Sequence, residues 1–186
     1  QPWNQKNCPF ISPRKRSAEI MTSLNNILLH QLPAKLKLLL LLTVVNLTVG
    51  VGIGLYYVVN TTELTPAGTT EHFSGSEIDA EFDIPEKYPK PVSELLTTTH
   101  NHILSLTLIF LVIGGIFYFN ISISGRMKTF LIAEPFISIL TTFGGIWLIR
   151  FVHPAFVYLV IPSGILMYSC YFIMTGVLLF ELALKK

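Results

Sequence analysis

Four long apolar intervals, almost free of charged residues, constrain this sequence more than any other feature. They cover residues 38–59, 102–119, 130–149 and 156–180. Each is close to or above the ~20 residues that a helix needs to cross the ~30 Å hydrocarbon core of a bilayer. Lipid offers the backbone no hydrogen-bond partners, and the runs are too long for barrel strands, so all four are predicted to be helices. The predicted fold class is all-α, an integral membrane four-helix bundle.

The composition agrees with a membrane protein. Only 13% of the residues are charged, whereas a soluble domain needs roughly a quarter. The net charge of +2 is small and the basic residues are dispersed, so no nucleic-acid partner is expected. Cys8 lies in a polar leader and Cys170 in an apolar run, so neither a disulfide nor a cysteine-pair metal site is predicted.

The beginning of the chain differs from the rest. Residues 1–20 are unlike the remainder of the sequence, and Met21 opens a natural start for a membrane protein, so we interpret 1–20 as a leader, a tag or a mis-called start. Residues 1–35 are predicted to form a cytoplasmic leader and residues 36–186 the four-span membrane domain. No A-x-A cleavage site stands after the first apolar run, so this run is expected to stay as an anchor.

Charged flanks predict the orientation of the spans. Lysine and arginine residues precede the first span, occupy the turn between the second and third spans, and close the chain. By the positive-inside rule, both termini are cytoplasmic, and the location is a bacterial inner membrane. The connector over residues 60–94 carries most of the acidic residues and is predicted to be an irregular extracytoplasmic loop. Pro91 and Glu94 predict that the second helix begins above the bilayer.

Histidines gather near the predicted extracytoplasmic edge. His100 and His102 lie where the connector meets the second span, His153 lies in the turn between spans three and four, and His72 lies in the connector. Residues two apart on a helix point to nearly opposite sides, so His100 and His102 cannot both bind one ion.

A polar stripe on the second span predicts which histidine faces inward. His102 shares one helix face with Glu94, Thr98 and Ser105, and this face is predicted to turn away from lipid. His102 is therefore predicted to be the interior residue.

The histidine positions permit a cofactor. Axial ligation of haem b requires histidines at equal depth on opposing helices, with His102 and His153 as the preferred ligands and His100 as the alternate. The alternative to haem is copper or zinc held by these three residues and His72. The other interpretation is that the imidazoles only hydrogen-bond carbonyls or acids in the headgroup layer.

Polar residues inside the spans are further candidates: Glu134, Arg150 and Asn46. An ionisable group within a span is a functional candidate, and the alternative for Glu134 is that it reaches the nearby interface and only fixes the helix. Asn46 is expected to find a partner across a helix interface.

Glycines recur in the first three spans, and small residues let helices approach closely. The first three spans are therefore predicted to pack tightly. The glycines concerned are Gly50, Gly52, Gly54, Gly114, Gly115, Gly144 and Gly145.

The stretches ELLTTTHNHILSLTLIFLVIGG and LIAEPFISILTTFGGIWLIR resemble small bacterial inner-membrane proteins with four spans. The resemblance covers residues 36–150 and rests on the THNH motif, the Glu-Pro-Phe turn and the Phe-Gly-Gly-x-Trp run in that order. It implies the membrane location and the importance of His100, His102, Glu134 and Arg150, and it implies no particular activity.

Two function hypotheses agree with these features. The first is a small subunit or accessory of a respiratory or electron-transfer complex that binds haem b or a metal through the histidines. The second is a structural or assembly protein that packs against a larger membrane partner, or in a homo-oligomer, without a cofactor. A stand-alone enzyme is not expected, because no nucleophile, base and orienting group converge. A transporter or channel ranks third, because Glu134 is the only deep ionisable candidate.

Overall fold

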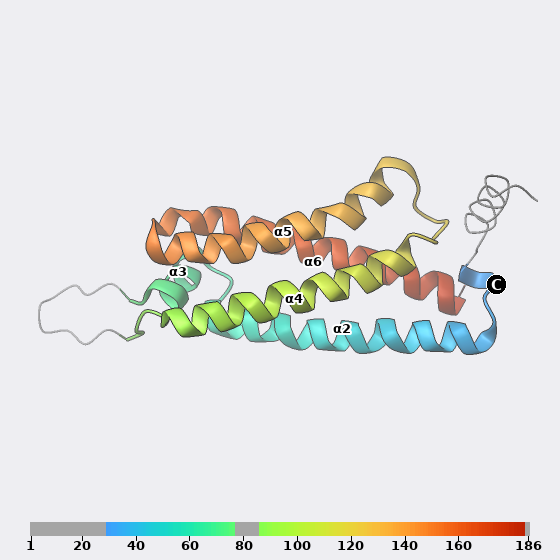
Figure 1. The fold of residues 1–186 in the computed structure, drawn as a ribbon, viewed down its shortest axis with the longest axis horizontal. Coiled ribbons are helices and arrows are strands. Elements are labelled where there is room, and N and C mark those ends of the chain that lie inside the picture. The colour runs from blue at the N-terminus through green and yellow to red at the C-terminus, as the bar shows by residue number, and fades with distance from the viewer. Residues whose placement is uncertain (1–28, 77–85, 185–186) are drawn as a thin grey trace, which may run out of the picture.

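Four long helices lie side by side and form the body of the protein (Figure 1). The computed structural model describes residues 29–76 and 86–184. Each long helix is apolar and long enough to cross a membrane. The predicted all-α membrane bundle and its four spans are confirmed. The helices are α2 (Ala34–Thr62), α4 (Val92–Phe117), α5 (Gly125–Phe151) and α6 (Val157–Leu179).

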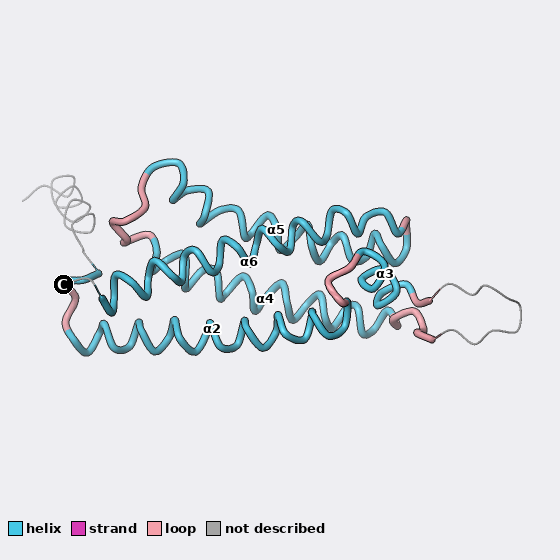
Figure 2. The backbone as a smooth tube through the Cα atoms, turned by 180° about the vertical axis from the view of Figure 1, so that it is seen from behind, coloured by secondary structure: helices cyan, strands magenta, loops and turns pink. Residues whose placement is uncertain are grey.

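Short helices mark the two ends of the bundle (Figure 2). At one end, α3 (Pro66–Ser74) lies near the start of α4 and the turn η2 (Pro154–Phe156) between α5 and α6. At the other end, η1 (Leu29–Gln31) contacts the π-helical turn η3 (Phe180–Leu184). We call these the α3 end and the η3 end. The first and last described residues lie together at the η3 end, opposite the connector.

The connector between α2 and α4 is more regular than the sequence predicts, because it contains α3. The Thr65 side chain caps this helix by accepting a hydrogen bond from the Gly68 N–H at 3.0 Å. Pro66 stands in the first turn, where its missing N–H costs nothing. The predicted leader over residues 1–20, Cys8 and residues 77–85 of the connector lie outside the described residues.

The tightest packing joins α5 to α6. Ile139 and Ile149 of α5 and Met174 and Leu178 of α6 are at most 2% exposed. A Cβ atom added to Gly145 would lie 2.4 Å from Val160 Cγ2, so this glycine allows the two helices to approach. α4 packs against both helices and adds Leu106, Phe110, Ile113 and Phe117 to the core.

α2 packs along the edge of the bundle. Its buried residues are Val44, Val51 and Thr62, and the Thr48 hydroxyl lies 3.3 Å from the Tyr171 hydroxyl of α6. The predicted glycine packing of the first span is wrong. A Cβ atom added to Gly50, Gly52 or Gly54 would meet no atom within 4 Å, because α2 turns a different face to the bundle.

The glycines of spans two and three fit the packing prediction only in part. Added Cβ atoms at Gly115 and Gly144 would also meet open space, and one at Gly114 would make an ordinary contact with Ile132 at 3.7 Å. Gly145 is therefore the glycine in these spans that permits a close approach between helices.

Candidate functional site

The four histidines predicted as ligands lie at the α3 end, on α3, in the first half of α4 and in the turn after α5. His100, His102 and His153 are exposed, whereas His72 is half-buried. Among the described residues, no group of three or more His, Cys, Asp or Glu side chains lies close enough to hold a metal ion. Their assignment to haem b, copper or zinc stays a prediction.

Hydrogen bonds distinguish the two preferred ligands by tautomer. The Nδ1 atom of His102 lies 2.8 Å from the Thr98 carbonyl oxygen. A carbonyl only accepts, so Nδ1 carries the proton and Nε2 keeps a free lone pair. The Nδ1 atom of His153 accepts a hydrogen bond from the Ala155 N–H at 3.0 Å, which leaves the proton on Nε2. In this geometry, Nε2 of His102 is able to bind a metal and Nε2 of His153 is not.

His102 does not face the bundle interior, contrary to the sequence-based expectation. Its imidazole is exposed and lies 5.1 Å from the Phe143 ring of α5, centre to centre. Ser105 is exposed as well, while Leu95 and Leu106 form the inward face of α4. The stripe lies near the α3 end, where polar groups need no enclosure, so the larger apolar side chains occupy the helix interface.

Arg150, the cation predicted to matter near this edge, lies in the last turn of α5 beside aromatic side chains. Its Cζ atom lies 5.3 Å from the centre of the Phe151 ring, and its buried Nε has no partner among the described residues. Phe151 stacks on Trp147, whose Nε1–H donates to the Thr99 hydroxyl of α4 at 2.9 Å. These contacts position the end of α5 against α4.

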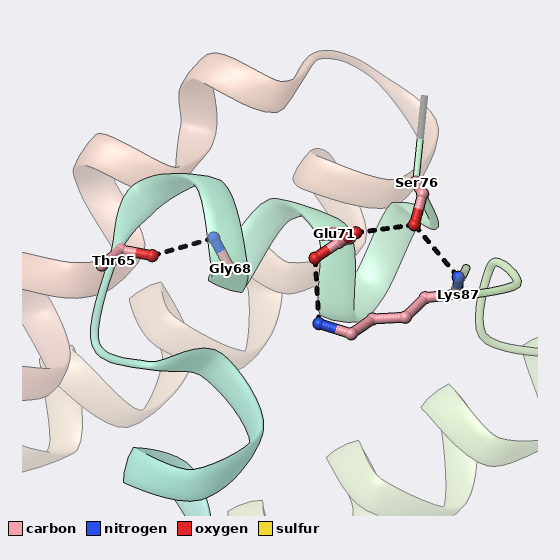
Figure 3. Close-up of polar contacts among 5 residues, drawn as sticks. All are labelled: Thr65, Gly68, Glu71, Ser76 and Lys87. Carbon is pink, nitrogen blue, oxygen red and sulfur yellow. Dashed lines mark hydrogen bonds and ion pairs between the residues drawn. The ribbon is translucent and has the colours of Figure 1, made fainter. Parts of the chain in front are cut away.

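A polar clamp closes the connector at the α3 end (Figure 3). The Glu71 carboxylate accepts hydrogen bonds from the Ser76 hydroxyl at 2.6 Å and from Lys87 Nζ at 2.9 Å. The Ser76 hydroxyl also accepts from the Lys87 N–H at 3.0 Å. The hydrogen bonds from Ser76 and Lys87 lower the pKa of Glu71. The clamp joins the described residues on either side of residues 77–85.

His72 is the histidine whose protonation the fold opposes. Its ring lies edge-on to Phe73, with the centres 4.9 Å apart. Burial lowers the pKa of His72, and the positive charge of Lys90 lowers it further, against the opposing effect of Glu94. The neutral form of His72 is therefore the form that α3 accommodates.

Within the membrane-spanning part, Glu134 begins a chain of polar side chains between α5 and α6. The Ser138 hydroxyl donates to Glu134 Oε1, and the Ser163 hydroxyl of α6 donates to the Ser138 carbonyl at 3.1 Å. The Thr142 hydroxyl lies 2.9 Å from that of Ser163. Glu134 is 7% exposed, and its buried Oε2 has no partner among the described residues. This buried position disagrees with the interpretation that the Glu134 carboxyl extends to the interface. A functional role for Glu134 stays a prediction.

Glu134 and Ser163 line a groove of about 440 Å³ between α5 and α6. Exposed apolar side chains, including Phe130, Ile137 and Leu159, form its walls. The groove is thus open towards lipid and polar at Glu134 and Ser163.

Glu181, in η3, is a buried polar residue that the sequence reasoning missed. It is 0% exposed, and its Oε1 accepts from the backbone N–H groups of Ile121 and Ser122 at 3.0 and 2.8 Å and from the Ser122 hydroxyl at 2.5 Å. The available signal was a single acid at the end of an apolar run, close to the two terminal lysines. Glu181 fastens the end of α6 to the loop between α4 and α5.

Asn46 has no partner on another helix within the described residues, contrary to expectation. Its Nδ2–H donates to the Leu42 carbonyl of the same helix at 2.8 Å, and the side chain is exposed. α2 therefore carries an amide on a face that the rest of the described chain does not cover.

A family model described as a transmembrane helical domain matches residues 63–186. The match begins directly after α2 ends at Thr62, and it includes the histidines, Glu134 and Glu181 but not Asn46. No curated protein and no solved structure matches the chain.

Proposed function

The chain belongs to this family of transmembrane helical domains, and we propose that it works as a structural subunit of a larger membrane assembly. The contact with the larger partner is made by the outer face of α2, which we define as Asn46, Gly50, Ile53, Gly54 and Tyr57. The observation that carries the proposal is an uncovered amide, Asn46, on the same helix face as two glycines four residues apart.

The outer face lies on the opposite side of α2 from the residues that pack on the bundle. Residues 46, 50, 53, 54 and 57 are spaced by three or four positions, or are direct neighbours, so they share a face. Val44 and Val51, which are buried, are centred about 125° away around the helix at 100° per residue. α2 can therefore hold the bundle with one face and a partner helix with the other.

The chemistry of this face suits a transmembrane helix. An amide facing hydrocarbon without a full set of hydrogen bonds is costly, and a partner helix relieves the cost. Gly50 and Gly54 have the small-xxx-small spacing that lets two helix backbones approach. Open space at both glycines leaves room for that approach.

Site-specific photo-crosslinking in native membranes tests this proposal. A photoreactive amino acid replaces Ile53, which is 66% exposed on the outer face of α2. The matched control replaces Ile165 of α6, which is 62% exposed on another helix. A discrete adduct heavier than two copies of the chain is expected from position 53 and not from position 165.

Variants on α2 sharpen the result. Gly50→Leu and Gly54→Leu should each remove the adduct, whereas Gly52→Leu, at an open position on another side of the helix, should leave it. An adduct with the mass of two chains would show that the partner is a second copy of this chain and not a larger protein. Absence of any adduct, or equal adducts from both crosslinking positions, would reject the proposal.

The second candidate is a subunit of a respiratory or electron-transfer complex that binds haem b or a metal. The tautomer of His102 favours this candidate, because Nε2 is free to bind a metal. The Thr98 carbonyl accepts from Nδ1–H, as a carbonyl commonly does for a histidine that binds a metal. An absorption spectrum and metal analysis of the protein purified from native membranes test it. A Soret band or bound metal that disappears in His102→Ala but not in His100→Ala is expected, and its absence from the unmodified protein rejects this candidate.

We also propose that both termini of the chain lie in the cytoplasm. Lysines at both ends of the membrane domain support cytoplasmic termini in a bacterial inner membrane. A reporter enzyme fused after Lys186 should be active in the cytoplasm, and one inserted within residues 77–85 should be active outside. The reverse pattern would contradict this orientation.

A further inference from the structure

We propose that the groove between α5 and α6 binds a membrane-dissolved molecule with an apolar body and a hydroxyl or phenol group that donates a hydrogen bond to Glu134. This site is independent of the outer face of α2. The groove holds about 440 Å³, a volume within the range of small-molecule sites. Its buried carboxyl distinguishes it from the gaps between helices that lipid tails fill.

The serine and threonine hydroxyls that line the groove have already used their protons. Ser138 donates to Glu134 Oε1, and Ser163 donates to the Ser138 carbonyl. Thr141 donates to the Ile137 carbonyl of its own helix at 2.9 Å. These three side chains therefore offer an incoming molecule no free donor.

The acceptors, in contrast, are left over. The Cys170 thiol, a weak donor, lies beside the Glu134 carboxyl, and the buried Oε2 accepts no full hydrogen bond from the described residues. Pro162 has no N–H, so the Tyr158 carbonyl four residues earlier lacks its normal helical donor. The remaining hydroxyl of the lining belongs to Tyr158, a 71% exposed side chain in the first turn of α6. The buried acceptors therefore select a ligand that brings its own O–H group, because a buried acceptor without a partner is costly.

The depth and walls of the groove limit the ligand to one that dissolves in the bilayer. Glu134 lies nine residues after Gly125, the first residue of α5, which is about 14 Å along the helix at 1.5 Å per residue. α5 has 27 residues and is about 10 Å longer than the ~30 Å hydrocarbon core. When α5 spans that core, Glu134 lies inside it, whereas phospholipid headgroups lie at its surface. Phe130, Ile137 and Leu166 on the walls are 42 to 67% exposed and offer an apolar surface to the body of the ligand.

The experiment uses para-decylphenol as the donor and para-decylanisole as the same apolar body without the proton. The full chain in phosphatidylcholine nanodiscs is photolabelled with a diazirine derivative of para-decylphenol, and labelled residues are mapped by mass spectrometry. We expect labels on the groove-lining residues of α5 and α6. We also expect para-decylphenol to displace the label, and the anisole to do so about tenfold less well, the loss of roughly one hydrogen bond.

Two variants test the site itself. Glu134→Leu should abolish the preference for the phenol over the anisole. Ile137→Trp should fill the groove and lower labelling at least tenfold, whereas Leu140→Trp, equally exposed on α5 but outside the groove, should not. If Glu134→Leu fails to fold, the proposal is tested by comparing Ile137→Trp with Leu140→Trp, and para-decylphenol with para-decylanisole. Equal displacement by phenol and anisole, labels away from the groove, or undiminished labelling of Ile137→Trp would each overturn the proposal.

Discussion

α2 and the α5–α6 pair both cross the membrane, but they are built for different neighbours. The most apolar stretch of α2 is more hydrophobic than that of any other span, yet only 11% of it is buried within the described chain, against 44% for α5 and for the segment Pro154–Leu184. In lipid, apolar composition does not drive helices together, because lipid tails are equally apolar. High hydrophobicity therefore does not by itself bury a span within the chain, and packing depends on small and polar residues elsewhere.

The family match also separates α2 from the other three spans. It covers residues 63–186 and leaves out α2. The matched part contains the close helix contact at Gly145, the polar chain that begins at Glu134, and the hydrogen bonds of Glu181 to the loop between α4 and α5. α2 is joined to it by apolar packing around Val44 and Val51 and by the hydrogen bond between the Thr48 and Tyr171 hydroxyls. We therefore treat α3 to η3 as the packed unit and α2 as a helix attached to its edge.

The largest difference in the free energy of unfolding is expected between two leucine-to-alanine substitutions, one in α6 and one in α2. Leu178→Ala removes a side chain that is 0% exposed in α6, and should lower the free energy of unfolding by about 2–5 kcal/mol through the cavity it leaves. Leu39→Ala in α2, where the leucine is 60% exposed, should cost less than about 0.5 kcal/mol. Reversible unfolding by SDS in mixed micelles measures both. Equal costs would show that α2 is as tightly packed as α6.

The next difference is expected between two adjacent glycines of α5. Gly145→Ala places a Cβ atom 2.4 Å from Val160 Cγ2, and should cost about 1–3 kcal/mol through overpacking. Gly144→Ala meets no atom within 4 Å, and should be neutral or stabilising by up to about 1 kcal/mol, because alanine favours the helix. The same unfolding assay compares them. If Gly145→Ala is as stable as Gly144→Ala, then Val160 moves aside and the close approach is not required.

The sequence predicted the spans well because crossing a bilayer imposes a length. The early start of α4 was also predictable from Pro91, and the helix begins at Val92. The rotation of each helix about its axis could not be predicted with the same success. Apolar residues cover every side of a span, so the buried side is not visible in the pattern. The polar stripe on α4 was used in its place and put His102 inward, although Leu95 and Leu106 occupy that face.

Polar contacts between residues far apart in the chain could not be predicted from the sequence either. Glu181 bonds to the backbone of Ile121 and Ser122, about sixty residues earlier, and no local pattern links such positions. Glu134 was recognised because a carboxyl within a span is unusual by itself. Its neighbour Ser163 lies on another helix, and only the packing of α5 on α6 brings it close. The candidate residues could thus be found singly, but not as a site.

A smaller effect is expected for the polar contact that joins the two regions. The Thr48 and Tyr171 hydroxyls lie 3.3 Å apart, and hydrogen bonds between transmembrane helices contribute about 0.6 kcal/mol on average. A double-mutant cycle with Thr48→Val and Tyr171→Phe should give a coupling of about that size in the SDS assay. A cycle with Thr43→Val, on α2 away from Tyr171, is the control and should give none. A coupling well above about 1 kcal/mol would mean that α2 is held more firmly than its burial indicates.

The smallest effect is expected at α3, which touches both regions and carries the half-buried His72. Burial and Lys90 lower the pKa of His72, so undocked α3 binds a proton more readily than docked α3. Docking should therefore weaken as pH falls below the ordinary histidine value of about 6.5, and the loss should stop below the lowered pKa. The Glu71 clamp keeps its charge in this window, because its pKa is lowered.

Hydrogen exchange of the α3 amides measures this docking. The exchange rates are compared between about pH 7.5 and about pH 5.5, on either side of the ordinary histidine pKa, after correction for the intrinsic pH dependence of exchange. Protection of α3 should fall at the lower pH while that of α6 stays constant, and His72→Asn should remove the difference. If α3 and α6 lose protection together, the proton acts on the packed unit as a whole, and the division between a firm α5–α6 pair and loosely held neighbours fails. If neither changes, the pKa of His72 is the same in docked and undocked α3, and its protonation has no effect on docking.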